Sequence, residues 1–482
     1  MSRDSARIAL TYVALNGLDI IAAYIRNAFL QAPSLEKHYI ICGLKFGLEN
    51  VGKTGLIKRA LYGWKSAGRD FWEHLRNCME FLDFKSCKAG RDIWICEAVK
   101  ADGTEYWEYV LLYCDDVLVI GNHCEQTLQR EIGKYFELKE EYIGVPTIYL
   151  GGKVNKVILN NGVVAWSFSS SQYVQAAVSN VEEYLRIKKD MKLPARVSSP
   201  LMSNYRPELD TTPELSPADA SYYMSLIGIL RWMVELGRVD ICVEVSLMSS
   251  QMAMPREGHL NQLFHMFGYL KVHHNSKMVF DPSEPEIDRS IFEKQDWSAT
   301  VYGADLKEEL PPNMPEQRGQ GLTTSAYVDS DHAGDSLTRR SRSGFLVFLN
   351  CSLIYWLSKK QTAIETSSFD SEFTAMKQCT DYICGLHYKL QMMGIPCDEP
   401  TYIYGDNQSG LANTSVPHSV LKKKSNSIAY HFVREGCARD EWRMAYVRTA
   451  SKPADLLTKP LPSGEKRKRF VRMLLYHLYN NH

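Results

Sequence analysis

Two adjacent aspartates, Asp115 and Asp116, lie between the apolar runs 109–114 and 117–120. Neighbouring carboxylates repel each other and are costly to remove from water, so this pattern predicts a tight turn that exposes them between two strands. A bound divalent cation would neutralise the remaining charge, because hard cations prefer carboxylate oxygens. Taken alone, the dipeptide favours a plain hairpin turn over a metal site.

Four further acids stand at the edges of predicted elements. Asp329 lies in an apolar-flanked strand, Glu372 at a helix start, Asp406 at a strand end and Asp455 in the first turn of a helix. Brought together, such carboxylates can hold two divalent cations, which in phosphodiester hydrolysis activate a water and relieve charge on the leaving oxygen. Each acid alone also has a structural explanation as a helix-dipole partner, a turn residue or an exposed strand residue.

The elements that would position these four acids follow Gly321. Strand, strand, strand, helix, strand, helix, strand, helix is the predicted order, which favours an α/β layer with helices packed on a sheet. Further upstream, residues 172–189 carry Val174, Val178, Val181 and Leu185 at helical spacing. Ser216 followed by Pro217 predicts another helix start, and the chain from there to about residue 280 is predicted to be mainly helical.

Length and composition indicate an ordinary globular protein of several domains. The chain has 482 residues, of which 45% are hydrophobic and 23% charged, and its formal net charge is zero. At roughly 100–200 residues per domain, this length predicts two to four domains. Proline-containing stretches at 190–217 and 281–321 predict a loop and an acidic linker. Neutrality excludes a uniformly basic coat for nucleic acid but leaves room for local basic patches.

The twelve cysteines bear on the redox compartment of the protein, and the lengths of its apolar runs bear on whether it could span a membrane. No Cys-x-x-Cys pair is present, so a zinc finger is not predicted. The cysteines are instead predicted to be free thiols in a reducing compartment. The N-terminus has no apolar signal core, and no run reaches the roughly 18 apolar residues of a membrane span. We therefore predict no membrane partner.

The motifs around the paired aspartates resemble those of a known family. Residues 113–116, Tyr-Cys-Asp-Asp, resemble the Tyr-x-Asp-Asp box of reverse transcriptases. Similarity to copia-type retrotransposons extends over nearly the whole chain, through residues 26–33, 59–67, 225–230, 237–242 and 269–271. The chain thus resembles the C-terminal part of a copia-type Pol polyprotein.

The resemblance implies a multidomain α+β and α/β fold. It comprises a truncated reverse-transcriptase palm with a helical thumb and connection, followed by a ribonuclease H-like domain with a mixed five-stranded sheet and helices. The implied units are a palm lacking most of the fingers at 1–122, the rest of the polymerase, thumb and helical connection at 123–280, a linker at 281–321, the ribonuclease H-like domain at 322–462 and a basic amphipathic C-terminal helix at 463–482.

The polymerase site is expected to be defective. In the family, the first palm motif, Asp-x-x-Asn-Ala, supplies a metal-binding carboxylate, and here Tyr24 occupies that position. A neutral phenol is a poor ligand for a hard cation. Asp19 lies five positions earlier, an odd number, so on a regular strand it faces the other side. In the family the fingers precede the palm motif, which begins here at Arg26, so most of the fingers are expected to be missing. We expect Asp115 and Asp116 to belong to a degenerate, inactive site.

The ribonuclease H site is expected to be complete. Its family motifs correspond to residues 327–335, 367–373, 405–408 and 454–461. By resemblance, Asp329, Glu372, Asp406 and Asp455 are the catalytic acids and bind two magnesium or manganese ions per intact site. The implied substrate is the RNA strand of an RNA·DNA hybrid, and template RNA and DNA are the implied partners.

Basic residues lie near these motifs. A hybrid would be bound by shape, backbone and 2′-hydroxyl contacts, for which arginine and lysine are suited. Solvated loop charge is the alternative explanation, and a packing role for His431 is favoured over a proton shuttle. The basic C-terminal helix either binds nucleic acid or docks on the domain. The predicted nucleic-acid contacts are Arg339, Arg340, Arg342, Lys359, Lys360 and Lys65, with a further run of lysines at 422–424.

The family context leaves several alternatives open. No protease triad, zinc knuckle or integrase zinc module is found, and other Pol or Gag products of the element are implied partners. By family analogy the product is intracellular, in a cytoplasmic particle or the nucleus. Two alternatives to an enzyme remain: a nucleic-acid-binding relic without catalysis, and a pseudogene product whose palm exposes apolar surface.

Overall fold

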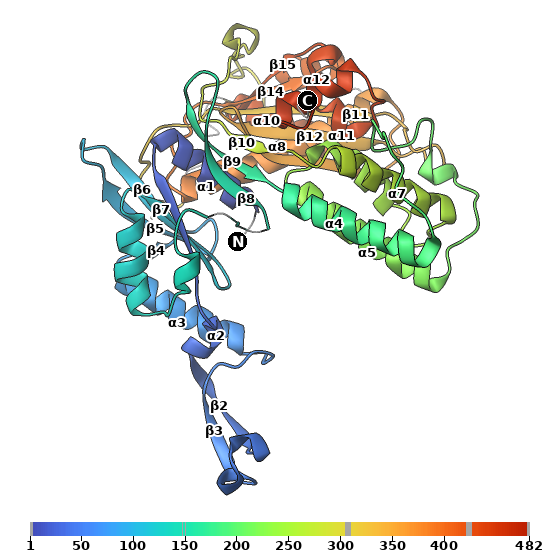
Figure 1. Ribbon diagram of the computed structural model, residues 1–482. Helices are drawn as coiled ribbons and strands as arrows, with labels where there is room; N and C mark the ends of the chain where they lie inside the picture. The colour runs from blue at the N-terminus through green and yellow to red at the C-terminus, as the bar shows by residue number, and fades with distance from the viewer. Residues whose placement is uncertain (1–2, 147, 150, 304–309, 421–426, 480–482) are drawn as a thin grey trace.

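The computed structural model describes residues 3–146, 148–149, 151–303, 310–420 and 427–479. Three parts can be followed in Figure 1: an N-terminal sheet with a projecting hairpin, a set of long helices, and a C-terminal sheet covered by helices. This is a mixed α/β architecture with several sheets, as the motifs predicted. Of the helices in the described ranges, none is long and apolar enough to cross a membrane.

The N-terminal sheet is antiparallel and buried on both faces. Leu118 and Ile120 pack with helix α1, while the alternating Val117 and Val119 pack with helix α3. This explains why the strands around the paired aspartates are continuously apolar. The strand order is β1-β7-β6-β5-β4. The elements are α1 (Arg3–Asn16), β1 (Asp19–Tyr24), α3 (Ala67–Phe81), β4 (Lys85–Ser86), β5 (Ile93–Val99), β6 (Glu105–Tyr113) and β7 (Asp116–Gly121), followed by short turns at Gln126–Glu131, Ile132–Lys134 and Glu140–Tyr142.

A two-stranded arm projects from this sheet (Figure 1). It follows α2 (Ala28–Gln31) and pairs β2 (Pro33–Ile41) with β3 (Thr54–Arg59), with short turns at Leu44–Phe46 and Leu48–Asn50 at its tip. Ile41, Leu44 and Leu48 are 75%, 74% and 82% exposed there. The arm is therefore held by its own backbone pairing and carries an apolar tip in solvent.

The middle of the chain is mainly helical. The predicted stripe on α4 (Ser171–Tyr184) is confirmed, since Val174, Val178 and Val181 are buried, and Leu185 follows in the turn Leu185–Lys189. Helix α5 (Pro217–Glu235) begins as predicted, and the Ser216 hydroxyl accepts a hydrogen bond from the Asp219 amide at 3.2 Å. The other elements are β8 (Lys153–Ile158), β9 (Val164–Ser169), the turns Pro207–Leu209 and Val239–Ile241, α6 (Cys242–Ser249), α7 (Glu257–Val272) and β10 (Met278–Phe280).

The C-terminal sheet has the predicted mixed five-stranded form. Its order is β13-β12-β11-β14-β15, with β11, β14 and β15 parallel and the other pairs antiparallel. Two helices, rather than the single predicted one, join β14 to β15; α9 ends at Ser415, just before Pro417, which disfavours helical backbone at the preceding residue. The elements are β11 (Thr324–Asp331), β12 (Arg342–Leu349), β13 (Ser352–Lys360), α8 (Ser368–Met392), β14 (Thr401–Gly405), α9 (Gln408–Ser415), α10 (Ser427–Ala438), β15 (Trp442–Tyr446), the turn Thr449–Ser451, α11 (Asp455–Thr458) and α12 (Glu465–Leu474).

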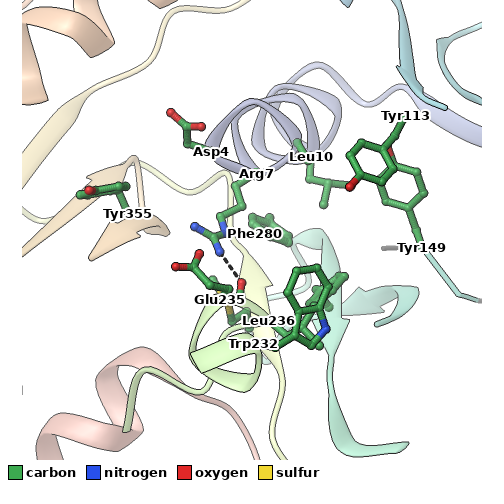
Figure 2. Close-up of a pocket in the computed structure, with 13 residues that line it drawn as sticks. Asp4, Arg7, Leu10, Tyr113, Tyr149, Trp232, Glu235, Leu236, Phe280 and Tyr355 are labelled. Carbon is green, nitrogen blue, oxygen red and sulfur yellow. Dashed lines mark hydrogen bonds between the residues drawn. The ribbon is translucent and has the colours of Figure 1, made fainter. Parts of the chain in front are cut away.

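Helix α1 joins the N-terminal sheet to the rest of the chain. Arg7 donates hydrogen bonds to the carbonyl oxygens of Ile354 in β13, at 3.0 Å, and of Glu235 at the end of α5, at 2.6 Å. A cavity of about 360 Å³ lies beside it, and Figure 2 shows Tyr113 and Tyr149 on one side and Trp232 on another. One apolar cluster runs from α1 through the N-terminal sheet to α8. The parts of the chain thus share a packed core.

The segment expected to be a linker packs closely against the C-terminal sheet. It contains the short turn Arg289–Ile291 and otherwise irregular backbone. Phe292 lies edge-on to Tyr402 and Tyr404, and the Arg434 guanidinium lies 4.7 Å from the ring centre of Trp297. The described part of this segment is therefore anchored by aromatic contacts, although it lacks long regular elements.

Candidate active site

Three of the four predicted acids meet at one end of the C-terminal sheet. Asp329 lies near the end of β11, Asp406 directly follows β14, and Glu372 lies in the first turns of α8. Each offers one carboxylate oxygen, and these oxygens lie within 4.8 Å of one another. The convergence follows from topology, because β11 and β14 are parallel neighbours whose carboxyl ends share an edge.

Helix α11 brings the fourth acid close to this group through a close approach at Gly344. Gly344 lies opposite Asp329 in the β11–β12 register. A Cβ at Gly344 would lie 2.7 Å from Cγ2 of Thr458 and 2.8 Å from Cβ of Leu457, so only glycine lets α11 pack at this distance. Asp455 is fully buried at the start of that helix, yet it is not a member of the group of three.

Asp455 has a mixed set of partners. Its Oδ2 accepts a hydrogen bond from Lys466, and its Oδ1 lies 3.2 Å from Nζ of Lys459 and 4.0 Å from Nζ of Lys452. Within the described residues Oδ1 receives no hydrogen bond of good geometry. This buried oxygen therefore has capacity for a further cation.

A lysine that the sequence analysis did not single out lies among the acids. Nζ of Lys452 donates to Oδ1 of Asp329 and lies 2.6 Å from Oδ1 of Asp406. The side chain is completely buried. Lys452 lies three residues before Asp455 and just ahead of the motif at 454–461, which was the available signal, but its type alone predicts a surface lysine.

Hydroxyl groups satisfy the remaining oxygens of two acids. Thr458 donates to Oδ2 of Asp329, and Thr449 donates to Oδ2 of Asp406 at 2.9 Å. Each oxygen of the Asp329 and Asp406 carboxylates therefore has one partner within the protein and a second lone pair left for a further ligand.

Burial and crowding shift the acidity of the cluster. Burial, reinforced by the charge of Asp329, raises the pKa of Glu372 to about 8. Burial also raises the pKa of Asp329, against the opposing charge of Lys452. Burial acts in the same sense on Asp406, but the hydrogen bond from Lys452 and its charge outweigh it and hold the pKa of Asp406 below its usual value. The donor set is hard, anionic and crowded, which is chemistry suited to a divalent cation.

The predicted basic contacts differ in accessibility. Arg339 and Arg340 are exposed on the loop between β11 and β12, and Lys359 is exposed near the end of β13, whereas Lys360 is partly buried and pairs with Asp335 at 2.8 Å. Arg342 departs from the prediction: it is 4% exposed and donates to the Ser246 hydroxyl, so it is a packing residue between β12 and α6.

Two other predicted basic sites lie elsewhere. Lys65 is exposed between β3 and α3, on the N-terminal part of the chain. The lysines at 422–424 lie outside the described residues. Near the exposed arginines, a cavity of about 500 Å³ is lined by Arg340, Lys360 and Lys459, among others.

The predicted turn is present, but Cys114 and Asp115 form it and Asp116 is the first residue of β7; both aspartates are half-buried rather than exposed as predicted. Cys114, with φ of 54°, lies between β6 and β7. Across the sheet, Tyr24 of β1 lies directly opposite Asp116, and Nζ of Lys139 lies 3.8 Å from the centre of the Tyr24 ring. Burial raises the pKa of Asp116, and the charge of Asp115 adds to this. Within the described ranges the two aspartates belong to no group of three metal-binding side chains.

Asp19 and His431 behave as the sequence analysis favoured. Asp19 lies opposite Gly121 at the far end of β1 and pairs with Lys156 at 3.0 Å. His431 is exposed on α10, and its Nδ1 is hydrogen-bonded to the Tyr302 hydroxyl at 2.7 Å. Neither residue contacts the acidic cluster or the turn aspartates in the contacts seen here.

The basic C-terminal helix is docked through its apolar side. Phe470, Val471 and Leu474 of α12 are buried, and Arg467 reaches inward to Glu244 at 3.1 Å. Regular helix ends at Leu474, although Leu475 and Leu478 beyond it are also buried. Of the two alternatives from the sequence, the contacts favour docking.

Comparison with known proteins shows what the chain is similar to. No family model matches it. It is 25% identical over 464 residues to the retrovirus-related Pol polyprotein from transposon RE1 of Arabidopsis thaliana, covering 95% of this chain and 27% of that protein. It is 23% identical over 472 residues to the retrovirus-related Pol polyprotein from transposon TNT 1-94 of Nicotiana tabacum, covering 96% of this chain and 31% of that protein. Both of these relatives are retrovirus-related Pol polyproteins.

The chain is homologous to the copia type of these polyproteins over about 95% of its length, as its motifs predicted. It spans less than a third of the length of these curated relatives. Among solved structures, it aligns with a foamy viral protease-reverse transcriptase in complex with RNA/DNA hybrid at 9% identity and a TM-score of 0.46, covering 96% of this chain and 48% of that one. Its alignment with the ribonuclease H1 LC11 has 14% identity and a TM-score of 0.20, covering 32% and 92%.

Proposed function

We propose that the C-terminal part of this reverse transcriptase/ribonuclease H-like chain hydrolyses the RNA strand of RNA·DNA hybrids, and that its polymerase site is inactive. The observation that carries the proposal is the convergence of carboxylate oxygens from Asp329, Glu372 and Asp406 within 4.8 Å, with Asp455 adjacent. Magnesium or manganese ions held by these acids would supply an activated water and stabilise the leaving oxygen.

The roles of the protein groups follow from their positions. Asp329 and Asp406 come from the ends of rigid neighbouring strands, so they fix the positions of the charges that a cation would bridge. Glu372, with its raised pKa, keeps a proton at neutral pH until a cation replaces that proton. The exposed Arg339, Arg340 and Lys359 are placed to contact a phosphate backbone, a kind of contact that positions a nucleic acid without selecting its sequence.

Inactivity of the polymerase rests on the β1–β7 pairing. The residue opposite Asp116 is Tyr24, and Nζ of Lys139 lies 3.8 Å from the centre of its ring. A phenol in this position offers no carboxylate to a metal. The domain boundaries given above, at 122, 280, 321 and 462, remain part of the proposal.

A second candidate function is binding of hybrids without cleavage. The observation that favours it is the buried Lys452 ammonium among the acids, which neutralises part of their charge without any metal. The two candidates make opposite predictions for magnesium dependence.

Cleavage of a labelled hybrid by the full chain distinguishes them. The full chain is incubated with an RNA·DNA hybrid and magnesium beside Asp406→Asn, which removes one charge with little change in shape. The proposed function requires RNA-strand cleavage that depends on magnesium and is lost in the variant. Hybrid binding without cleavage by the folded wild-type chain would select the second candidate.

A further inference from the structure

The Lys452 ammonium occupies a position that a divalent cation would be expected to share. It contacts Oδ1 of Asp329 and of Asp406, and it lies 4.0 Å from Oδ1 of Asp455. Three of the four acids are thus arranged around one positive charge. Among the described residues, no hydrogen bond or ion pair joins this ammonium to Glu372, which offers an oxygen within 4.8 Å of oxygens of Asp329 and Asp406.

An ammonium and a divalent cation exclude each other from the same oxygens. Both need close contact with the same carboxylate oxygens, and like charges at such a distance repel strongly in a buried site. The Lys452 side chain is completely buried, so it has no solvated position nearby without a change in the loop that carries it. That loop is the turn Thr449–Ser451, whose Thr449 hydroxyl is itself bonded to Asp406.

We propose that Lys452 is a built-in cation that holds one of the two cation positions of the acidic cluster. The position shared by Asp329, Asp406 and Asp455 is then taken by the protein, and the position on the Glu372 side is left for a divalent ion. This inference rests on the proposed metal-binding function. It implies that the chain binds one divalent ion fewer than the four acids alone would allow.

Counting bound manganese tests the inference. The background carries Asp115→Asn and Asp116→Asn, so that the turn aspartates contribute no ions. In this background, Lys452→Met should bind one Mn²⁺ more per full chain than the chain that keeps Lys452, measured by paramagnetic resonance of free Mn²⁺. Lys459→Met is the matched control, because Lys459 pairs with Asp455 from the edge of the site and is partly exposed. Its ion count should equal that of the background.

Thermal unfolding gives a second measurement. Without metal, Lys452→Met leaves buried carboxylates unpaired and should unfold at a lower temperature. Mn²⁺ should raise the melting temperature, since an ion that binds only the folded state stabilises that state. The rise should be larger for Lys452→Met than for the background chain. If Lys452→Met does not fold, Lys452→Gln is used in its place. Independently of any variant, two ions bound at the acidic cluster of the chain that keeps Lys452 would overturn the inference.

The outcomes separate the inference from the proposed function. Equal ion counts of one or two with and without Lys452 overturn the inference while the metal site stands. No Mn²⁺ bound by either folded chain overturns the metal site itself, and the inference with it. One additional ion in the variant supports both.

Discussion

Tyr24 lies directly opposite Asp116 in the β1–β7 pairing, and the Lys139 ammonium lies 3.8 Å from the centre of the Tyr24 ring. Asp116 therefore lies opposite a phenol that is itself in contact with a cation. A phenol is a poor ligand for the hard cations of a two-metal site. This pairing is the basis of the proposal that the polymerase site is inactive.

The first prediction concerns this pairing. Primer extension on an RNA template by the full chain should equal the background of the Asp115→Asn, Asp116→Asn double variant. The reason is that Tyr24 supplies no ligand opposite Asp116. Template-dependent synthesis that disappears in the double variant would contradict the prediction. Tyr24→Asp tests the same point in the other direction, and is expected to increase Mn²⁺ binding at the turn.

The second prediction concerns hybrid binding by three exposed basic side chains near the acidic cluster. Arg339→Ala, Arg340→Ala and Lys359→Ala together should weaken hybrid binding and lower the steepness of its salt dependence by about 1 for each phosphate that the variant no longer binds. Fluorescence anisotropy at several salt concentrations measures the slope. Lys85→Ala, exposed on the far edge of the N-terminal sheet, is the control. An unchanged slope in the triple variant would show that these three side chains are only solvated surface charges.

The third prediction concerns the buried ion pair that docks α12. Arg467 lies 3.1 Å from Glu244, and both side chains are 1% exposed. Arg467→Met leaves Glu244 as a buried unpaired charge and should lower the free energy of unfolding by about 3–5 kcal/mol. Chemical denaturation measures the change. Arg472→Met on the exposed side of the same helix should change stability little, and equal effects of the two variants would refute the docking role.

The fourth prediction concerns pH. Burial lowers the pKa of His387 to about 4, and one ring nitrogen lies 2.7 Å from the Thr401 hydroxyl. In the unfolded chain a histidine has a pKa of about 6.5, so between these values the unfolded state binds more protons. The stability contributed by neutral His387 is therefore fully present above about pH 6.5 and is lost as the pH falls toward 4.

The measurement is chemical denaturation at several pH values for the wild type and for His387→Gln. In this window the wild type should lose up to about 1.4 kcal/mol per pH unit more than the variant. The carboxyl groups titrate in both proteins, so the difference between the two curves isolates the contribution of His387. Parallel curves would show that the histidine keeps its ordinary pKa.

Local sequence determined much of this protein. The paired aspartates at a turn, the start of α5 at Ser216, the apolar stripe of α4 and the mixed C-terminal sheet followed from residue periodicity, capping and turn chemistry or from the family motifs. These features depend on interactions between residues close in the chain, or on patterns that repeat along an element.

Tertiary structure decided the rest. The burial of Arg342, the docking of α12 and the packing of residues 292 and 297 depend on contacts between segments far apart in sequence. The clearest case is Lys452, whose type predicts a solvated surface charge. It is buried because β11, α11 and the end of β14 bring three carboxylates around it, and only the assembled fold makes an ammonium stable there.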